Sequence, residues 1–96
     1  MLTLCKNMRF YYVYILESKA DGKFYTGYTS DLRRRLEEHN SGLTKSTKYR
    51  LPLELVYFEG SNSSKDALKR EKYLKTTYGK RYIKNRIKFS LSENLT

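Results

Sequence analysis

Cysteine and histidine are scarce in this chain, which has one of each, Cys5 and His39. One thiol cannot form an internal disulfide, and one cysteine with one histidine cannot supply the four protein ligands of a structural zinc site. The composition therefore argues against a disulfide-stapled or zinc-stabilised domain. We expect Cys5 to be a reduced bystander near the N-terminus.

Long apolar runs are missing as well. No run approaches the roughly 20 apolar residues that cross a bilayer, and the N-terminal residues lack the apolar core of a signal peptide. We therefore expect a cytoplasmic protein without a membrane partner. The 96 residues are 39% hydrophobic and include 10 tyrosines and 4 phenylalanines. This composition is too aromatic for intrinsic disorder and supports one modest hydrophobic core.

Charge of one sign dominates the chain: 20 Lys and Arg against 10 Asp and Glu give a net charge of +10. Residues 65–88 hold ten basic and two acidic residues, a net charge of +8 within that segment. Such a stripe is typical of a surface that binds a polyanion, because neutralised phosphates release their counterions. The alternative is a solvated helix face. The residues that we expect to contact nucleic acid are Lys69, Arg70, Lys72, Lys75, Lys80, Arg81, Lys84 and Arg86.

The first third of the chain predicts a β-hairpin. Residues 10–17 are almost all β-branched, aromatic or aliphatic, and residues 23–29 alternate between two faces, which are both strand patterns. Asp21 and Gly22 between them form a strong hairpin-turn pair. Gly27 interrupts the second strand, and an interior glycine often marks the close approach of a backbone or a ligand.

A helix and a third strand are expected next. Ser30 or Asp31 can cap a helix that covers residues 31–40, because a short polar side chain accepts a backbone N–H at a helix start. A polar loop then leads past Pro52 into a strand over residues 53–59.

The longest helix is expected over residues 64–78. Asn62 or Ser63 can cap its start, and Gly79 marks its end. The segment KRYIKNRIKF that follows predicts a short basic helix.

The element order predicts an α/β (α+β) fold with a small, mostly antiparallel three-stranded sheet flanked by helices, in the order ββαβα plus a short C-terminal helix. We expect a flexible N-terminal extension over residues 1–9 and one domain over 10–88. A frayed C-terminal tail is expected over residues 89–96.

A carboxylate interrupts the apolar face of the longest helix. Ala67, Leu68, Leu74 and Tyr78 recur at helical spacing and predict the face that packs on the core. Glu71 falls on this face, where a charge is costly unless something offsets its lost hydration. A Lys or Arg partner, protonation or a bound cation could do so, and the pattern leaves all three open.

Arg35 and His39 lie four residues apart, on one face of the first helix. Arginine keeps its charge and offers a planar fork of five donors, which suits a phosphate whose negative charge grows during a reaction. A lone histidine is also consistent with a purely structural role. Most of the ten tyrosines must be core or surface residues.

The order of these residues resembles the GIY-YIG nuclease domain. Tyr12-Val13-Tyr14 and Tyr25-Thr26-Gly27 resemble the two halves of its signature, and Arg35, His39 and Glu71 fit the family's later positions. The likeness runs from about Phe10 to Ile87 and is strongest to the stand-alone, single-domain branch, which is similar to the nuclease domain of the bacterial nucleotide-excision repair endonuclease. The first triplet departs from Gly-Ile-Tyr, and Asn85 is a candidate for a late asparagine whose spacing gives no firm match.

The resemblance implies a role for each matching residue. Tyr14 and Tyr25 would hold or activate the attacking water or orient the phosphate, Arg35 would stabilise the transition state, and His39 would assist proton transfer. Glu71 would bind one divalent cation, Mg²⁺ or Mn²⁺, and Mg²⁺ needs few protein ligands.

These roles predict a metal-dependent endonuclease that hydrolyses DNA rather than RNA, is structure-selective or weakly specific, and acts in DNA repair or recombination. One alternative is a non-catalytic nucleic-acid-binding module that stacks bases on Tyr12, Tyr14 and Tyr25 and uses the basic stripe. Another is an interaction partner of a repair or translation complex.

Overall fold

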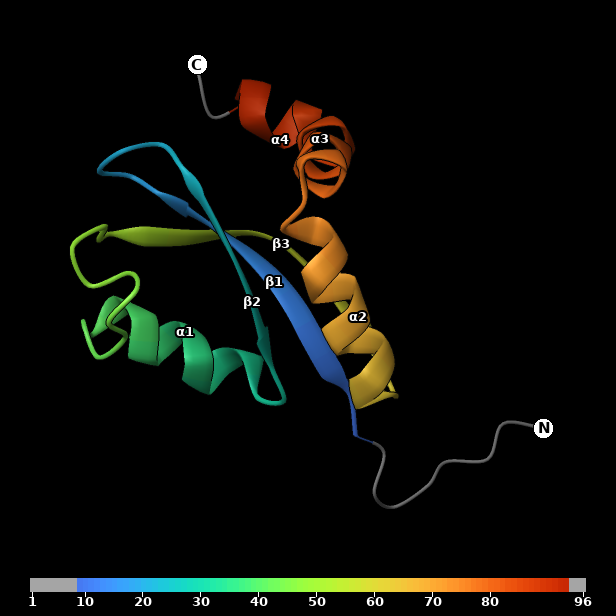
Figure 1. Ribbon diagram of the computed structural model, residues 1–96. Helices are drawn as coiled ribbons and strands as arrows, with labels where there is room; N and C mark the ends of the chain where they lie inside the picture. The colour runs from blue at the N-terminus through green and yellow to red at the C-terminus, as the bar shows by residue number, and fades with distance from the viewer. Residues whose placement is uncertain (1–8, 94–96) are drawn as a thin grey trace.

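The computed structural model describes residues 9–93 as a three-stranded antiparallel sheet with helices on both faces (Figure 1). The strand order is β2-β1-β3, so the first strand of the chain is central. The α+β fold expected from the sequence is confirmed. The elements are β1 (Tyr11–Ser18), β2 (Phe24–Thr29), α1 (Leu32–Asn40), β3 (Leu53–Ser61), α2 (Ser64–Leu74), α3 (Thr77–Arg86) and α4 (Lys88–Glu93).

The hairpin of β1 and β2 forms where the sequence predicts it. Gly22 adopts a φ of 72°, which a glycine reaches without strain, and its N–H donates to the Ser18 carbonyl over 2.8 Å. The register pairs Tyr14 with Gly27 and Ile15 with Thr26. Because side chains alternate along a strand, the two members of each pair share a face, and the two pairs lie on opposite faces.

Each face of the sheet has its own core. On one face Tyr14, Leu16 and Leu53 pack with Leu32 and Leu36 of α1. On the other face the buried residues come from β1 and from the helices at the C-terminal end of the chain, which Figure 1 places across the sheet from α1. They are Val13, Ile15, Ala67, Leu74, Ile83 and Ile87.

The start of α1 is positioned by the expected cap. Asp31 has an extended backbone, and its side chain accepts the Arg34 N–H over 3.1 Å. Ser63 caps α2 in the same way by accepting from the N–H of Asp66. These two caps set the start of the helices that carry Arg35, His39 and Glu71.

The prediction of one long helix over residues 64–78 is wrong. Helix α2 ends at Leu74, and Thr76 caps a new helix, α3. The Thr76 hydroxyl donates to the Tyr73 carbonyl and accepts from the Gly79 N–H. Gly79 therefore lies inside α3 and does not end α2. The change of direction turns Tyr78 outward, and it is 71% exposed. Leu68, also expected in the core, is 40% exposed within α2, where Ala67 and Leu74 form the buried face.

The C-terminal segment is more ordered than expected. A frayed tail is predicted from residue 89, but α4 covers Lys88–Glu93. Leu91 packs against the core on its face of the sheet, which gives the segment a reason to stay helical. Residues 1–8, which hold Cys5 and most of the predicted N-terminal extension, and residues 94–96 lie outside the described part of the chain. Among residues 9–93, no helix is long and apolar enough to cross a membrane.

The α2–α3 junction predicts a strong effect of Gly79→Ala. A Cβ at this position would collide with the Tyr73 carbonyl and with the Leu74 backbone, and a backbone obstacle cannot rotate away. We expect urea denaturation to show a loss of roughly 1–3 kcal/mol of unfolding free energy, the usual cost of overpacking. Tyr78→Ala, at the exposed neighbouring position, should change stability by less than about 0.5 kcal/mol. Equal stability of the two variants would contradict this account of the junction.

Candidate active site

Tyr14 is at the centre of the candidate site. It lies on the central strand, is 1% exposed, and faces Gly27 directly across the hairpin. A Cβ at Gly27 would fall on the Tyr14 hydroxyl and ring carbons. Only glycine leaves the space that this ring occupies, so the close approach predicted at Gly27 is made by a protein side chain.

The Tyr14 hydroxyl links α1 to the sheet through hydrogen bonds. Arg35 Nε donates to the Tyr14 oxygen over 3.3 Å, and the same oxygen lies 2.9 Å from Nε2 of His39. Nδ1 of His39 lies 2.7 Å from the Thr47 hydroxyl. The result is a continuous chain from Arg35 through Tyr14 and His39 to Thr47, which we call the relay.

Burial sets the protonation state of His39. The side chain is fully buried, and this burial, reinforced by the nearby Arg35 charge, lowers the His39 pKa from 6.5 to about 4. The imidazole is therefore neutral at pH 7, with one nitrogen that donates and one that accepts. Because Arg35 can only donate to the Tyr14 oxygen, the Tyr14 hydrogen points to Nε2, which leaves Nδ1–H to donate to Thr47.

Tyr25 completes the group on the same face of the sheet. Its ring centroid lies 5.1 Å from that of His39 and 6.3 Å from that of Tyr14. Tyr25 is only half-buried, and its hydroxyl has no hydrogen-bond partner among the described residues. Tyr25 and Arg35 are thus the members of the group that can meet a substrate, while Tyr14 and His39 lie behind them.

Glu71 approaches this group from α2. It lies within electrostatic range of Tyr14, whose pKa is raised above 10, mainly by burial and to a small extent by the Glu71 charge; the hydrogen bond from Arg35 opposes the rise. The Glu71 side chain is 17% exposed, and its Oε2 lies 3.4 Å from Nζ of Lys75. The sequence left open whether a basic partner, protonation or a bound cation compensates the Glu71 charge. In the structure a lysine partner is present.

The donor set fits a magnesium ion better than a metal that needs a dedicated cage. The described residues contain no cluster of three His, Cys, Asp or Glu side chains that could hold a metal ion. Mg²⁺ commonly uses one or two carboxylates and completes its shell with waters and substrate phosphate. Glu71 would supply that carboxylate, and its charge reaches Tyr14.

Two residues that hold the site together were not among those predicted from the sequence. Thr47 is fully buried and holds His39, but it comes from an irregular loop in which no periodic pattern marks it. Glu38 holds the Nη1 end of Arg35 over 3.2 Å. Its spacing of three residues on a helix was a signal that could have found it.

The basic stripe is only partly available to a ligand. Arg70 binds Glu59 over 2.5 Å and lies 4.7 Å above the Tyr82 ring, and Lys75 pairs with Glu71. These two predicted nucleic-acid contacts are therefore engaged within the protein. The other predicted contacts are exposed: Lys69, Lys72, Lys80, Arg81, Lys84 and Arg86. Asn85 is also exposed on α3.

The alternative stacking platform is not formed. It requires Tyr12, Tyr14 and Tyr25 to be open to solvent on one sheet face. Tyr14 is 1% exposed and its hydroxyl is bonded on both sides. A base could not stack on this ring without dismantling the relay.

The buried, neutral His39 predicts a pH dependence of stability. Below pH 6.5 the unfolded chain takes up a proton on this residue that the folded chain refuses until about pH 4. The free energy of unfolding therefore has its full value above pH 6.5. It falls by up to about 3 kcal/mol as the pH decreases toward 4. Urea denaturation across this range should show the loss in the wild type and a flatter profile in His39→Gln. Parallel profiles for the two proteins would mean that His39 is not held neutral.

Comparison with known proteins finds a family model that matches most of the chain. The GIY-YIG catalytic domain family matches residues 10–87. The UPF0213 protein of Streptococcus pneumoniae is 49% identical over 65 residues, which are 67% of this chain and 65% of that protein, so the chain spans just under two thirds of that relative. The UPF0213 protein of Staphylococcus saprophyticus is 46% identical over 67 residues, 69% of this chain and 80% of that protein.

A solved relative has the same fold. The solution NMR structure of a UPF0213 protein from Bacillus halodurans is 40% identical, covers 77% of this chain and 81% of that chain, and superposes with a TM-score of 0.50. GIY-YIG domains are generally endonucleases that act on DNA, typically with a divalent metal. The match over most of the chain, together with the UPF0213 relatives, shows that this protein belongs to the GIY-YIG family and carries a nuclease-type domain.

Proposed function

We propose that this protein is a divalent-metal-dependent endonuclease that hydrolyses DNA phosphodiester bonds, with selection by DNA structure or only weak sequence specificity, in DNA repair or recombination. The observation that carries the proposal is the relay, which connects a partly exposed arginine to a buried, neutral histidine through one tyrosine hydroxyl. Exposed basic residues on α2 and α3 supply the complementary charge for a polyanion.

Arg35 is placed to hold the scissile phosphate. Its Nε and Nη1 are bonded to Tyr14 and Glu38, which fix the guanidinium plane, and its side chain is 32% exposed. The fork retains donors that are not used in these bonds. A donor fixed before the reaction stabilises charge that develops on the phosphate without a cost of reorganisation.

The relay holds the groups that meet the attacking water and the phosphate. The water oxygen forms a bond to phosphorus while the bond from phosphorus to the leaving oxygen breaks; the water gives up a proton to solvent, and the leaving oxygen takes a proton from solvent. Tyr25, with its free hydroxyl, orients the water. Neutral His39 accepts the hydrogen of Tyr14 and so keeps that hydroxyl, and through it Arg35, in place.

Glu71 would hold the divalent cation. When bound, such an ion polarises the phosphate and stabilises the leaving oxygen. The Lys75 ammonium that now pairs with Glu71 is 54% exposed, and an i,i+4 pair of this kind is worth only about 0.3–0.5 kcal/mol. Lys75 can therefore swing to solvent at little cost and leave the carboxylate to a cation.

The proposal predicts opposite results for two arginines on α1. Arg35→Ala should lower the rate of DNA cleavage by about 100- to 1,000-fold, as loss of a fixed transition-state donor does. Arg33→Ala removes the same charge from the exposed side of the helix and should change the rate by less than about twofold. The measurement is nicking of supercoiled plasmid and cleavage of flap, branched and duplex DNA with Mg²⁺ or Mn²⁺.

Two glutamate variants, measured in the same cleavage assay, test the metal site. Glu71→Gln should abolish the stimulation by metal, whereas Glu37→Gln, exposed on α1, should retain it. Cleavage that survives both Arg35→Ala and Glu71→Gln at the wild-type rate would rule out the proposed site. Binding of DNA without any cleavage by the wild type would favour the non-catalytic module.

A further inference from the structure

A pocket lies behind the candidate active site, on the other face of the sheet. It is lined by the β1–β2 hairpin, the end of α2 and α3, and it has a volume of about 330 Å³. Thr26 lines this pocket, whereas Tyr25, its neighbour in β2, packs against His39. The pocket and the candidate site therefore lie back to back across a single strand.

The chemistry of the pocket is that of a receptor for an aromatic anion. Phe24, Leu74 and Ile83 give it an apolar lining, and the volume is in the range of pockets that hold small organic groups. Half-buried Phe24 brings an aromatic ring to the lining, and such a ring can stack with a nucleobase of any sequence.

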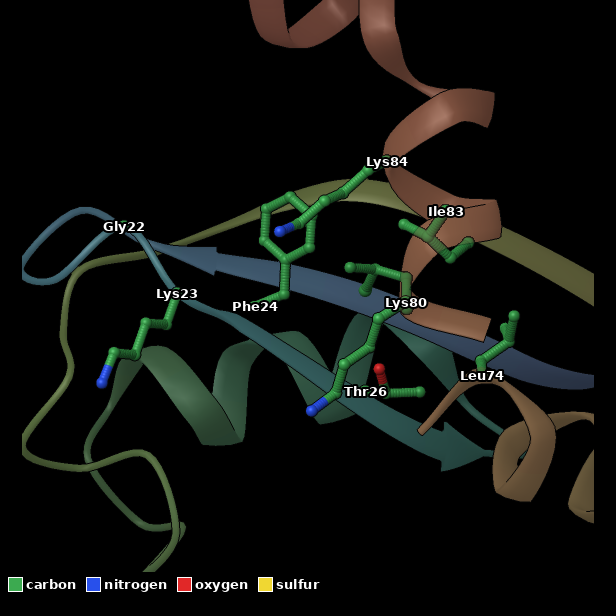
Figure 2. A pocket seen from close by; sticks show the side chains of 9 residues that line it. Gly22, Lys23, Phe24, Thr26, Leu74, Lys80, Ile83 and Lys84 are labelled. Carbon is green, nitrogen blue, oxygen red and sulfur yellow. The ribbon is translucent and has the colours of Figure 1, made fainter. Parts of the chain in front are cut away.

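The polar groups of the pocket are cationic. Lys23, Lys80 and Lys84 line it, and no carboxylate does. None of the three ammonium groups has an ion-pair partner among residues 9–93. Figure 2 shows Lys84 extending across the Phe24 ring and Lys80 extending beside Thr26, whereas Lys23 points away from both. One unpaired cation thus lies at the aromatic ring and a second lies farther along β2 in the same pocket, and a nucleotide offers a base for the ring and phosphate charge for the cations.

The positive charge continues beyond the pocket. Lys80 and Lys84 also line a shallower depression on α3 together with Thr77 and Arg81. A free mononucleotide would need only one cationic pocket. A track of cations that extends from the pocket along a helix favours a ligand with successive phosphates, a nucleic-acid strand.

The position of the pocket favours single-stranded over duplex DNA. In the described sheet no strand pairs with the outer side of β2, where Arg50 donates to the Phe24 carbonyl over 3.4 Å, and a nucleic-acid strand that crosses this edge beside Arg50 can reach both faces. Duplex DNA has a persistence length of about 50 nm and cannot fold around the width of one β-strand, whereas an unpaired strand can. Contact with Tyr25 and Arg35 on one face and with Lys80 and Lys84 on the other requires an unpaired segment.

We propose that the pocket formed by Phe24, Lys80 and Lys84 binds an unpaired nucleotide of the DNA substrate, a few nucleotides from the bond to be cut, so that the protein selects DNA with a single-stranded arm. This inference rests on the proposed function and adds the substrate class to it. The Lys84 side chain, which is exposed, would move off the Phe24 ring to let the base pack there, and the two lysines would bind its phosphate and the next one.

Binding in the absence of metal tests the pocket separately from cleavage. The probes are a fluorescent flap DNA with a single-stranded arm and a blunt duplex of the same sequence, measured by anisotropy in EDTA. We expect Lys80→Ala/Lys84→Ala to weaken flap binding about tenfold and to reduce the slope of log affinity against log salt by about 1.4, the value for two lost phosphate contacts on a single strand. Binding of the blunt duplex should change by less than about twofold.

Two further variants separate charge from stacking. Lys45→Ala/Lys48→Ala removes two exposed lysines from the loop after α1 and should leave flap affinity within about twofold of the wild type. Phe24→Leu keeps apolar volume in the pocket, removes the ring and should lower flap affinity about fivefold or more. Circular dichroism verifies that each variant is folded.

Three outcomes would overturn the inference: equal losses for flap and blunt duplex, an equal loss in the control variant, or a flap affinity that Phe24→Leu leaves unchanged. Displacement of the flap by deoxyadenosine monophosphate at equal concentration would also overturn it, because the pocket would then be a site for a free nucleotide. Flap binding that depends on the pocket, in a protein that cuts no DNA, would contradict the proposed function and leave the pocket assignment intact.

Discussion

The hydroxyl group of Tyr14 ties together the parts of this protein that matter for function. It receives a hydrogen bond from Arg35 and contacts His39, and both partners come from α1, so one oxygen fixes a helix against the central strand. The arrangement depends on Gly27, because any other residue at the paired position would occupy the space of the tyrosine ring. A buried polar group needs partners to be tolerated, and Tyr14 has them on two sides.

The sheet could be predicted well from the sequence, because it follows from local rules. The structure brings Tyr14, Arg35 and His39 into contact, and their roles stay predictions. Alternating strand residues, the Asp21-Gly22 turn and the Asp31 cap act over a few positions, and the register of the hairpin then places Tyr14 opposite Gly27. The break between α2 and α3 was not predictable from periodicity, because a threonine cap competes with helix continuation only when the following helix has a core to bury. The role of Thr47 could not be predicted from the sequence either, because only tertiary packing brings its partner His39 to it.

The two faces of the sheet divide the work of recognition and chemistry in this account. The face under α1 holds a buried, hydrogen-bonded group that fixes Arg35, whereas the face under α2 and α3 presents cations and an apolar pocket. The pairing of Arg70 with Glu59 and of Lys75 with Glu71 shows that counting basic residues overstates the surface available to DNA. The edge strand β2 separates the two faces, and its narrow width explains why a flexible nucleic-acid strand suits the molecule better than a rigid duplex.

The tautomer of His39 is the most direct test of the relay. Nitrogen-15 NMR of the imidazole at pH 7 distinguishes a ring nitrogen that carries a proton from one that does not. The account predicts a neutral ring with the proton on Nδ1, where it faces Thr47, and an unprotonated Nε2 that accepts from Tyr14. A proton on Nε2, or a ring that is charged at pH 7, would contradict it, because Tyr14 would then have no acceptor for its hydrogen.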